Sequence, residues 1–398
     1  MKSFRYLIIG GGMTADAAVR GIRRVDREGS IALISDEPHP PYNRPPLSKG
    51  LWEGKPERRI WRKTEKKDVQ LILGKRATGL DPAERTVRDE SGEVYHFEKL
   101  LLATGARVRK LPFGGADIVY LRTLEDYRRL RTLSEAGNAF AVIGGGFIGT
   151  EIASSLAGLG KSVSLVFPET GPLARFLPPD LSSALASHLE ENGVQIFSRH
   201  SAVSLEGRNG RQALTLRDEA SGESRRLEAS GVAAGIGVIP NVELAKEAGL
   251  GTENGVIVDE YFKTSHSGIY AAGDVAAYVD PVLGKRRRVE HEDAANTMGM
   301  LSGLAMAGEP SPYEGLPYFY SQTFDIYYEA VGDLHPGLEI ETDWAEPNRK
   351  GVVYYLEERR IRGVLLWNVT KRLDAARELI REACRWEPGA LRGRIEIA

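Results

Sequence analysis

The stretch that decides the fold is "YLIIGGGMTADAA" (residues 6–18), in which an apolar run ends in three glycines and a helical pattern follows. The same order recurs at "AVIGGGFIGTEIA" (141–153). Each stretch leads to a second apolar run, "SIALIS" (30–35) and "SVSLVF" (162–167). Strand–helix–strand units of this kind are typical of parallel sheets. The sequence therefore predicts two doubly wound units.

Both glycine turns fit the dinucleotide-binding pattern G-x-G-x-x-G/A. Three residues of each turn match it: Gly10, Gly12 and Ala15 in the first, and Gly144, Gly146 and Gly149 in the second. The first glycine allows the tight turn and the second lets the backbone approach a pyrophosphate, which then meets the free N–H groups of the helix N-terminus. Two purely structural turns are the alternative, because such turns are common between strands and helices.

A carboxylate follows the second strand of each unit, which favours the dinucleotide interpretation. Asp36 follows "IALIS" and Glu169 follows "SVSLVF", each at the distance expected for a group that binds an adenosine ribose. The chain is therefore expected to bind two dinucleotides. A flavin at one site and a nicotinamide cofactor at the other would explain both loops.

Length and composition limit the class of protein. The chain has 398 residues, of which 42% are hydrophobic and 27% charged, and its formal net charge is -2. These values predict a globular protein of two or three domains and argue against nucleic acid as a partner. No apolar run is long enough for a membrane span, and no His/Cys cluster has metal-ligand spacing.

The cysteine count excludes one branch of redox chemistry. Cys384 is the only cysteine, so the chain can form neither an internal disulfide nor a dithiol relay. We expect Cys384 to pack on the last helix. A reducing cytoplasm is the expected setting.

These patterns predict an α/β fold with two Rossmann-like doubly wound nucleotide-binding domains, of the glutathione-reductase-like kind, and a small C-terminal α+β domain. The expected FAD-binding domain is discontinuous and comprises 1–115 and 241–312. The NAD-binding domain is expected at 116–240 and the C-terminal domain at 313–398. The last part contains "KGVVYYLEERRIRGVLLWN", which predicts two strands, and the amphipathic helix "LDAARELIREACRW".

Longer motifs resemble a known family. "PYNRPPLSK" (41–49), "LLATG" (101–105), "VIPNVELA" (238–245) and "GIYAAGDVA" (268–276) are similar to FAD-dependent, NADH-using ferredoxin-reductase-type oxidoreductases. Within that group the chain most resembles apoptosis-inducing factor and its prokaryotic relatives. One departure is Tyr320, which stands where the apoptosis factor has tryptophan. The segment that follows is one residue shorter.

The resemblance implies a set of site residues. Those implied for FAD are Gly10, Gly12, Thr14, Asp36, Glu37, Arg44, Lys49, Ala77, Arg122, Asp274, Glu290, His291 and Tyr320. Those implied for NADH are Gly144, Gly146, Ile148, Glu151, Glu169, Arg175, Gly237, Glu329 and Asn368. Asp274 has the alternative role of a helix cap. The basic run 285–288 is expected to be a solvated loop, with a docking patch for an acidic carrier as the alternative.

Glu151 stands where a pyrophosphate should meet the helix N-terminus. A carboxylate in the first turn is ordinarily favoured by the helix dipole. The resemblance offers a second explanation, in which Lys49 from the first domain lies at the flavin edge and pairs with Glu151 from the second domain. Lys49 and Glu151 are therefore the predicted catalytic residues.

The resemblance implies an enzyme that takes a hydride from NADH onto the flavin N5 atom and passes electrons to a ferredoxin, a rubredoxin-like carrier or a quinone. The alternative is a redox-sensing flavoprotein, similar to apoptosis-inducing factor, whose long-lived NADH-reduced complex changes its oligomeric state. A homodimer stays open in either case.

Overall fold

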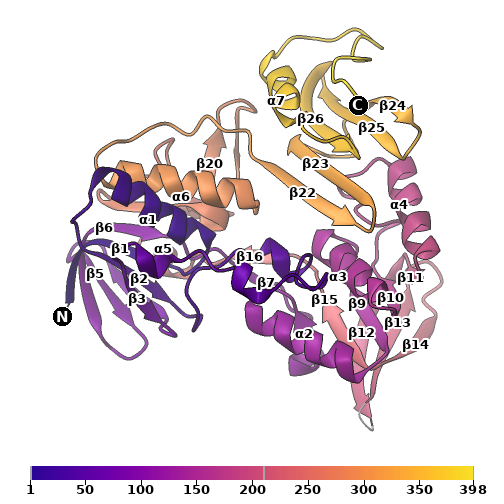
Figure 1. Ribbon diagram of the computed structural model, residues 1–398, viewed down its shortest axis with the longest axis horizontal. Coiled ribbons are helices and arrows are strands. Elements are labelled where there is room, and N and C mark those ends of the chain that lie inside the picture. Colours follow the sequence, from indigo (N-terminus) through magenta and orange to yellow (C-terminus); the bar gives the residue numbers. More distant parts are fainter. Residues whose placement is uncertain (1, 209–210, 398) are drawn as a thin grey trace. The chain divides into compact units, whose positions relative to one another are not determined.

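The computed structural model describes residues 2–208 and 211–397 (Figure 1). The chain forms two compact units, each built from three separate stretches. Unit 1 consists of Met1–Arg44, Glu57–Arg107 and Ile239–Tyr318, and unit 2 of Pro45–Pro56, Val108–Val238 and Phe319–Ala398. The short stretch that contains Lys49 therefore belongs to unit 2.

Unit 1 is built on a seven-stranded sheet. Its strand order is β3-β2-β1-β6-β5-β4, and β19 also pairs with β6. The strands are β1 (Lys2–Ile9), β2 (Ile31–Ser35), β3 (Gln70–Leu73), β4 (Ala77–Asp81), β5 (Thr86–Asp89), β6 (Val94–Leu102) and β19 (Ile269–Ala271). β1, β2, β3, β6 and β19 pair in parallel, whereas β4, β5 and β6 pair antiparallel. The central strand β1 ends at the first glycine loop.

Helices and a smaller sheet complete unit 1. The helices are α1 (Met13–Val25), α5 (Glu243–Glu247) and α6 (Glu292–Met306). The smaller sheet has the order β17-β18-β20-β21, with strands Thr252–Glu253, Gly255–Ile257, Ala276–Asp280 and Lys285–Arg287. α1 lies alongside α6 (Figure 1), and small residues such as Ala18 and Gly303 form the contact. This packing fixes the start of α1, where the first glycine loop ends.

Unit 2 contains a five-stranded sheet of order β11-β10-β9-β15-β8, in which all pairs are parallel. The strands are β8 (Ile118–Tyr120), β9 (Ala139–Ile143), β10 (Ser162–Val166), β11 (Val194–Phe197) and β15 (Gly231–Ala234). Three helices accompany it: α2 (Leu124–Ala136), α3 (Phe147–Gly158) and α4 (Pro179–Glu191). An antiparallel sheet consists of β12 (His200–Arg208), β13 (Arg211–Asp218) and β14 (Ser224–Ala229). The second glycine loop connects β9 to α3.

The C-terminal part of unit 2 is a five-stranded sheet with one helix, as the predicted α+β domain requires. The strand order is β22-β23-β26-β25-β24. The elements are β22 (Tyr318–Thr323), β23 (Ile326–Gly332), β24 (Glu339–Glu346), β25 (Lys350–Glu357), β26 (Arg360–Trp367) and α7 (Leu373–Arg381). Two short strands, β7 (Ala106–Val108) and β16 (Val238–Pro240), pair with each other.

The expectation that Cys384 packs on the last helix is wrong. α7 ends at Arg381, and Cys384 lies beyond it on the surface. The helical pattern of the sequence continues past this point, but the apolar residues that α7 buries end at Ile380. The helix therefore stops where it no longer has an apolar face to bury.

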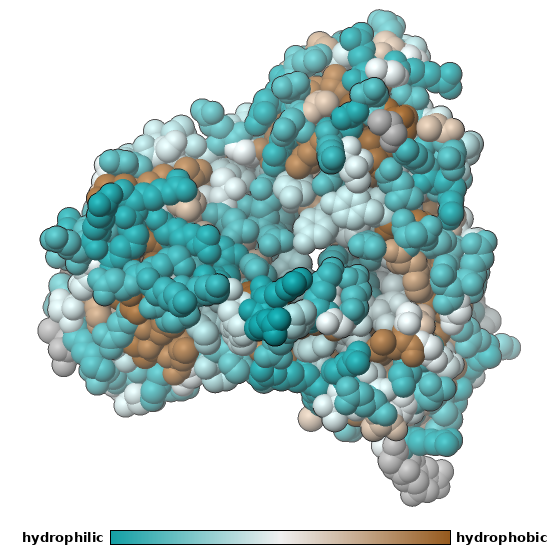
Figure 2. All heavy atoms as spheres, in the orientation of Figure 1, coloured by the Kyte–Doolittle hydropathy of each residue, from teal (hydrophilic) through white to brown (hydrophobic). Residues whose placement is uncertain are grey.

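The face of the molecule shown in Figure 2 is mostly polar. On the face shown in Figure 2, hydrophobic residues form several separate groups among hydrophilic ones. Among the described residues, no helix is long and apolar enough to cross a membrane.

Candidate functional site

The first glycine loop lies in unit 1 between β1 and α1. Gly10 has a φ of +125°, and a Cβ atom there would lie 2.1 Å from the carbonyl oxygen of Ala103. Gly12 is the N-cap residue of α1, and a Cβ atom on it would have no heavy atom within 4 Å. The N–H groups at the start of α1 are therefore open to an approaching anion, which is what a dinucleotide pyrophosphate needs.

The second glycine loop repeats this geometry in unit 2. Gly144 has a φ of +108°, and a Cβ atom there would lie 2.4 Å from the carbonyl oxygen of Gly235. Gly146 is the N-cap residue of α3. Ile148, in the first turn, is 39% exposed. Gly237 has open space around its Cα atom. The loop therefore also fits a pyrophosphate.

An acidic residue after the second strand pairs with an arginine in each unit. In unit 1 the Glu37 carboxylate accepts hydrogen bonds from the Arg44 guanidinium and, at 2.6 Å, from the hydroxyl of Tyr42. Burial alone would lower the pKa of Arg44, but the Glu37 carboxylate raises it above its ordinary value. Asp36, the residue singled out by its spacing, is exposed beside this pair.

In unit 2 the corresponding carboxylate is Glu169. An Arg175 nitrogen lies 2.7 Å from a Glu169 oxygen, and the arginine side chain is 78% exposed. Glu169 lies near the end of β10, where a ribose-binding carboxylate is expected. The ion pair places the positive charge of Arg175 beside this carboxylate.

Glu151 is the centre of a buried polar cluster in unit 2. Its side chain is 3% exposed. One carboxylate oxygen accepts hydrogen bonds from Lys49 Nζ at 2.6 Å and from the Ser321 hydroxyl at 2.5 Å. The other accepts one from the Ser48 hydroxyl at 2.5 Å. The expected pair of Lys49 and Glu151 is present, but the two residues do not come from different units, because both belong to unit 2.

Aromatic side chains lie close to this cluster. Lys49 Nζ is 5.3 Å from the ring centroid of Tyr320. The ring of Phe147, the first residue of α3, is 4.8 Å from the rings of both Phe176 and Phe319. Burial, reinforced by the charge of Glu151, raises the pKa of Tyr328, so this hydroxyl stays protonated. The buried ion pair therefore has a partly apolar surrounding, in which charge interactions are stronger than in water.

Two further residues predicted for NADH are held together in the C-terminal sheet. Asn368 accepts a hydrogen bond from the Tyr327 backbone N–H at 2.7 Å, and Glu329 accepts one from the Tyr327 hydroxyl at 2.9 Å. The second carboxylate oxygen of Glu329 is buried and has no hydrogen-bond partner within residues 2–208 and 211–397. An acceptor of this kind suits a ligand hydroxyl or amide.

Arg288 contacts two of the residues predicted for FAD in unit 1, Asp274 and Glu290. It donates a hydrogen bond to the Asp274 backbone oxygen at 3.0 Å and pairs with Glu290 at 2.7 Å. Burial and the nearby charge of Arg287 lower the pKa of His291 to about 4, so its ring is neutral near pH 7. The backbone at Gly273 lies against the Thr14 side chain, which brings Thr14 next to Asp274.

The prediction of a solvated loop at 285–288 is right only in part: Lys285 and Arg286 are exposed, but they belong to a strand. Residues 285–287 form strand β21, Arg287 pairs with the buried Asp280, and Arg288 is 8% exposed. The pattern of four cations gave no sign of the buried carboxylate partner of Arg287. Of the remaining predicted residues, Ala77 begins β4 in unit 1, while Arg122 precedes the N-cap residue of α2 in unit 2.

Sequence reasoning missed a second buried carboxylate, Asp16 on α1. Its side chain is 0% exposed, and the Arg62 and Arg20 Nε atoms each lie 2.8 Å from it. Lys67 Nζ lies at 3.3 Å, and the Thr64 hydroxyl donates to it at 2.6 Å. Burial alone would raise the pKa of Asp16, but the hydrogen bonds from Thr64 and Arg62 outweigh it and lower the pKa. An acidic residue in the helical pattern next to the glycine loop was the only available signal.

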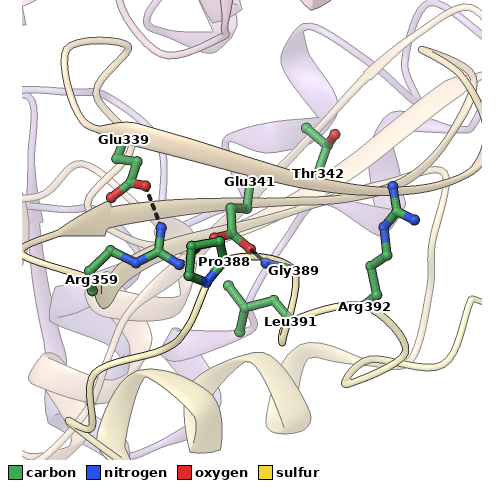
Figure 3. Close-up of a pocket in the computed structure, with 8 residues that line it drawn as sticks. All are labelled: Glu339, Glu341, Thr342, Arg359, Pro388, Gly389, Leu391 and Arg392. Atoms are coloured by element: carbon green, nitrogen blue, oxygen red, sulfur yellow. Dashed lines mark hydrogen bonds and ion pairs between the residues drawn. The ribbon is translucent and has the colours of Figure 1, made fainter.

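A pocket of about 360 Å³ lies elsewhere in unit 2, and its lining includes none of the predicted site residues (Figure 3). In it the Arg359 guanidinium extends toward Glu339 and Glu341, while Arg392 lies on the opposite side. These carboxylates already neutralise Arg359, so the pocket offers no clear cofactor chemistry. Within the part of the chain that the structure describes, no group of three His, Cys, Asp or Glu residues could hold a metal ion.

Comparison with known proteins identifies the family. Residues 4–299 match the pyridine nucleotide-disulphide oxidoreductase family, and residues 336–382 match "apoptosis-inducing factor, mitochondrion-associated, C-term". The chain belongs to the pyridine nucleotide-disulphide oxidoreductase family. This result confirms the predicted family and, with the structural likeness below, the predicted fold. It also confirms FAD and NAD(H) as the cofactors of the family.

Several members of the family are similar over the whole chain. The ferredoxin–NAD(+) reductase component of the anthranilate 1,2-dioxygenase system from Burkholderia cepacia is 32% identical, covering 98% of this chain and 97% of that protein. Mitochondrial apoptosis-inducing factor 1 from Dictyostelium discoideum is 32% identical, covering 96% and 79%. The reductase in the covalent putidaredoxin reductase–putidaredoxin complex superimposes with a TM-score of 0.90 at 29% identity, covering 98% and 96%.

Proposed function

We propose that the protein is an NADH-dependent flavoprotein reductase that passes electrons to an external carrier of the ferredoxin or rubredoxin type, with a quinone as a further acceptor. One observation carries this proposal. The chain is similar over 98% of its length to a ferredoxin–NAD(+) reductase component, while its single cysteine leaves no dithiol to relay electrons. Electrons must therefore leave the flavin for an acceptor outside the chain.

FAD, when bound, supplies the redox chemistry: it accepts a hydride from NADH and releases electrons to the carrier. The chain's own residues bind, orient and shield the reactants. The first glycine loop, Glu37 and Arg44 fit FAD, and the second loop, Glu169, Glu329 and Asn368 fit NADH. Three of the residues predicted for FAD, Lys49, Arg122 and Tyr320, belong to unit 2.

Lys49 and Glu151 are the proposed catalytic residues. Lys49 would supply a positive charge where negative charge develops on the cofactor, which is the most effective form of electrostatic stabilisation. Glu151 holds the ammonium group at 2.6 Å, and Ser48 and Ser321 hold both carboxylate oxygens. The Tyr320 ring, whose centroid is 5.3 Å from Lys49 Nζ, would limit access of water to the pair.

Stopped-flow absorbance tests this function. The FAD-loaded protein is first mixed with NADH, and the reduced protein is then mixed with a ferredoxin, a rubredoxin or a quinone. We expect rapid reduction by NADH, followed by reoxidation that at least one protein carrier accelerates over oxygenated buffer alone. Failure of every carrier to accelerate reoxidation would contradict the proposal.

The same experiment addresses the redox-sensor alternative. The match of residues 336–382 to the C-terminal region of apoptosis-inducing factor is the observation that favours it. A sensor would keep its reduced complex for many minutes in the presence of carriers, and its oligomeric state by light scattering would change on addition of NADH. The similarity to ferredoxin reductases in both sequence and structure favours the enzyme. A cytoplasmic location, in line with the single cysteine, is part of this proposal.

A further inference from the structure

Arg62 joins three separate segments of unit 1 through one guanidinium group. Its Nε atom lies 2.8 Å from the Asp16 carboxylate. Its two terminal nitrogens donate to the side-chain oxygens of Asn43 at 2.7 Å and Asn296 at 2.6 Å. The Arg62 side chain is 9% exposed. All five donor hydrogens of a guanidinium lie in one plane, so a group that uses three nitrogens on three acceptors fixes their relative positions.

Each of the three acceptors stands next to a part of the proposed FAD site. Asp16 is on α1, in the turn that follows the first glycine loop. Asn43 immediately precedes Arg44, which pairs with Glu37. Asn296 is on α6, whose N-cap residue is His291. A shift of any one segment would therefore move a group that the cofactor is expected to contact.

Neutralising Asp16 does not require Arg62. Arg20 Nε lies 2.8 Å and Lys67 Nζ 3.3 Å from the same carboxylate, and Thr64 donates a further hydrogen bond. If Arg62 no longer contacted Asp16, the cations Arg20 and Lys67 would still neutralise the carboxylate. The contacts that Arg62 alone provides are those to Asn43 and Asn296, so its particular contribution is orientation.

We propose that Arg62 is a positioning residue of the FAD site in unit 1, which holds the segment of Arg44 and the start of α6 in register with the first glycine loop. This inference rests on the proposed assignment of FAD to unit 1. The supporting contacts around a binding site commonly determine how well its direct contacts are preorganised. Arg62→Lys keeps a positive charge but cannot reach three acceptors in one plane.

The test compares Arg62→Lys with Arg59→Lys, the same substitution at an exposed position in the same segment. Apoprotein is prepared from each variant and from the wild type. The measurements are the FAD dissociation constant by fluorescence titration, the visible circular dichroism of the bound flavin, and the thermal midpoint of the apoprotein. We expect Arg62→Lys to raise the dissociation constant at least about tenfold and to change the flavin spectrum. Arg59→Lys should match the wild type.

The apoprotein separates orientation from general stability. If Arg62 acts on the cofactor, the thermal midpoint of the Arg62→Lys apoprotein should differ from that of the wild-type apoprotein by no more than roughly 2–4 °C. An FAD dissociation constant within about twofold of wild type with an unchanged flavin spectrum would overturn the inference. A large fall in the apo midpoint without a change in the flavin spectrum would overturn it too.

If Arg62→Lys does not fold, Asn296→Ala decides, because it leaves all contacts of Asp16 in place. It should weaken FAD binding and alter the flavin spectrum in the same direction, and wild-type values would overturn the inference. Uptake of FAD by the wild type separates the two proposals. A wild type that binds no FAD contradicts both, whereas normal wild-type binding with unaffected variants contradicts only the role of Arg62.

Discussion

Each unit has a carboxylate buried near the start of the helix that follows its glycine loop, and the two differ in their surroundings. Asp16 in unit 1 has three cationic side chains and one hydroxyl around it. Glu151 in unit 2 has one cation, Lys49, and the hydroxyls of Ser48 and Ser321. Both helix starts can hold a pyrophosphate. A negative charge beside an anion therefore has to be neutralised in both units.

The two carboxylates also occupy different positions on their helices. Asp16 is the fourth residue of α1, whereas Glu151 is the fifth of α3. One residue corresponds to a rotation of about 100° around a helix axis. The two side chains therefore leave their helices in different directions, despite the similar motifs. We infer that Asp16, which contacts three cations, stabilises the fold of unit 1. Glu151 and its single lysine are proposed to act in the reaction.

The largest effect is expected from Asp16→Ala. Removing the carboxylate leaves the poorly exposed cations Arg62 and Lys67 beside each other without a counter-charge. Loss of one member of a buried ionic cluster costs about 3–5 kcal/mol. Glu151→Ala should cost less, about 1–3 kcal/mol, because it leaves one lysine and two hydroxyls. Denaturant unfolding of the apoproteins measures both, and equal losses would contradict the distinction between the two clusters.

The stability of the protein in acid should reveal the contribution of Asp16. The pKa of Asp16 is lower in the folded chain than its ordinary value of 3.8, so the unfolded chain takes up a proton on this residue first. The stabilisation is complete above that ordinary value and is lost as the pH falls through the lower folded value. Asp16→Asn should therefore flatten the part of the stability profile below about pH 4. A profile parallel to that of the wild type would show that Asp16 does not titrate in this way.

The next prediction concerns Lys49 and Glu151. Each single alanine variant should slow reduction by NADH about a hundredfold, or ~2.7 kcal/mol, while FAD stays bound. Because the two side chains act through one ion pair, the double variant should be much less impaired than the product of the single effects. Single-turnover stopped-flow measures all three. Multiplicative losses, or normal rates in either single variant, would return Glu151 to the role of an ordinary carboxylate at a helix start.

Ser321→Ala provides a graded comparison within the same cluster. It removes one of three hydrogen bonds to Glu151 and leaves the contact of Lys49 intact. We expect a smaller rate loss than in Glu151→Ala, about tenfold, because a hydrogen bond to a charged group contributes about 1.5 kcal/mol or more. A loss as large as that of Glu151→Ala would mean that the serine, and not the lysine, sets the position of the carboxylate.

The sequence predicts the parts of this architecture that depend on local pattern. The glycine loops and the apolar strands before them have a spacing that only a strand–turn–helix connection satisfies, so β1, α1, β9 and α3 could be predicted. Lys49 and Glu151 are 102 positions apart, and only resemblance to a family paired them. Ser321 and Glu151 are 170 positions apart. Contacts at such separations depend on the tertiary fold and leave no periodic signal.

The Asp16 cluster was not predicted either, because its members are also brought together only by the tertiary fold. An acidic residue in a helix and a basic segment "RRIWRKTEKK" (58–67) each suggest solvent-exposed surface when considered alone. Only the folded chain brings the carboxylate and its cations together and removes them from water. The error at 285–288 is similar, since Arg287 pairs with the buried Asp280 and Arg288, itself 8% exposed, pairs with Glu290.

A smaller effect is expected for coenzyme choice, where the acid–arginine pairs of the two units can be compared. Glu37 and Arg44 are both mostly buried, whereas Arg175 is 78% exposed beside Glu169. The Glu169 carboxylate should accept hydrogen bonds from the adenosine ribose and repel a 2′-phosphate. We expect NADH to be preferred over NADPH by at least about tenfold in kcat/KM, or ~1.4 kcal/mol. Equal efficiencies would show that the exposed arginine turns to the phosphate.

Arg175→Ala sharpens this prediction. Without the arginine, the Glu169 charge is no longer compensated, and the preference for NADH should increase. Glu169→Ser should reduce the preference and leave Arg175 available to a 2′-phosphate. A preference that changes in the same direction in both variants would contradict the opposed roles of the two residues.

The smallest effect is expected at Cys384, which lies in unit 2 but outside both clusters. It is exposed beyond the end of α7, and its sulfur atom is 3.9 Å from a carboxylate oxygen of Glu382. Cys384→Ser should leave FAD content unchanged, and the rate of reduction by NADH should stay within about twofold of the wild type. Stopped-flow on the two proteins at equal FAD loading makes the measurement. A clear loss of reduction with fold and FAD content intact would place a thiol in the electron path and would remove Lys49 and Glu151 from the centre of the mechanism.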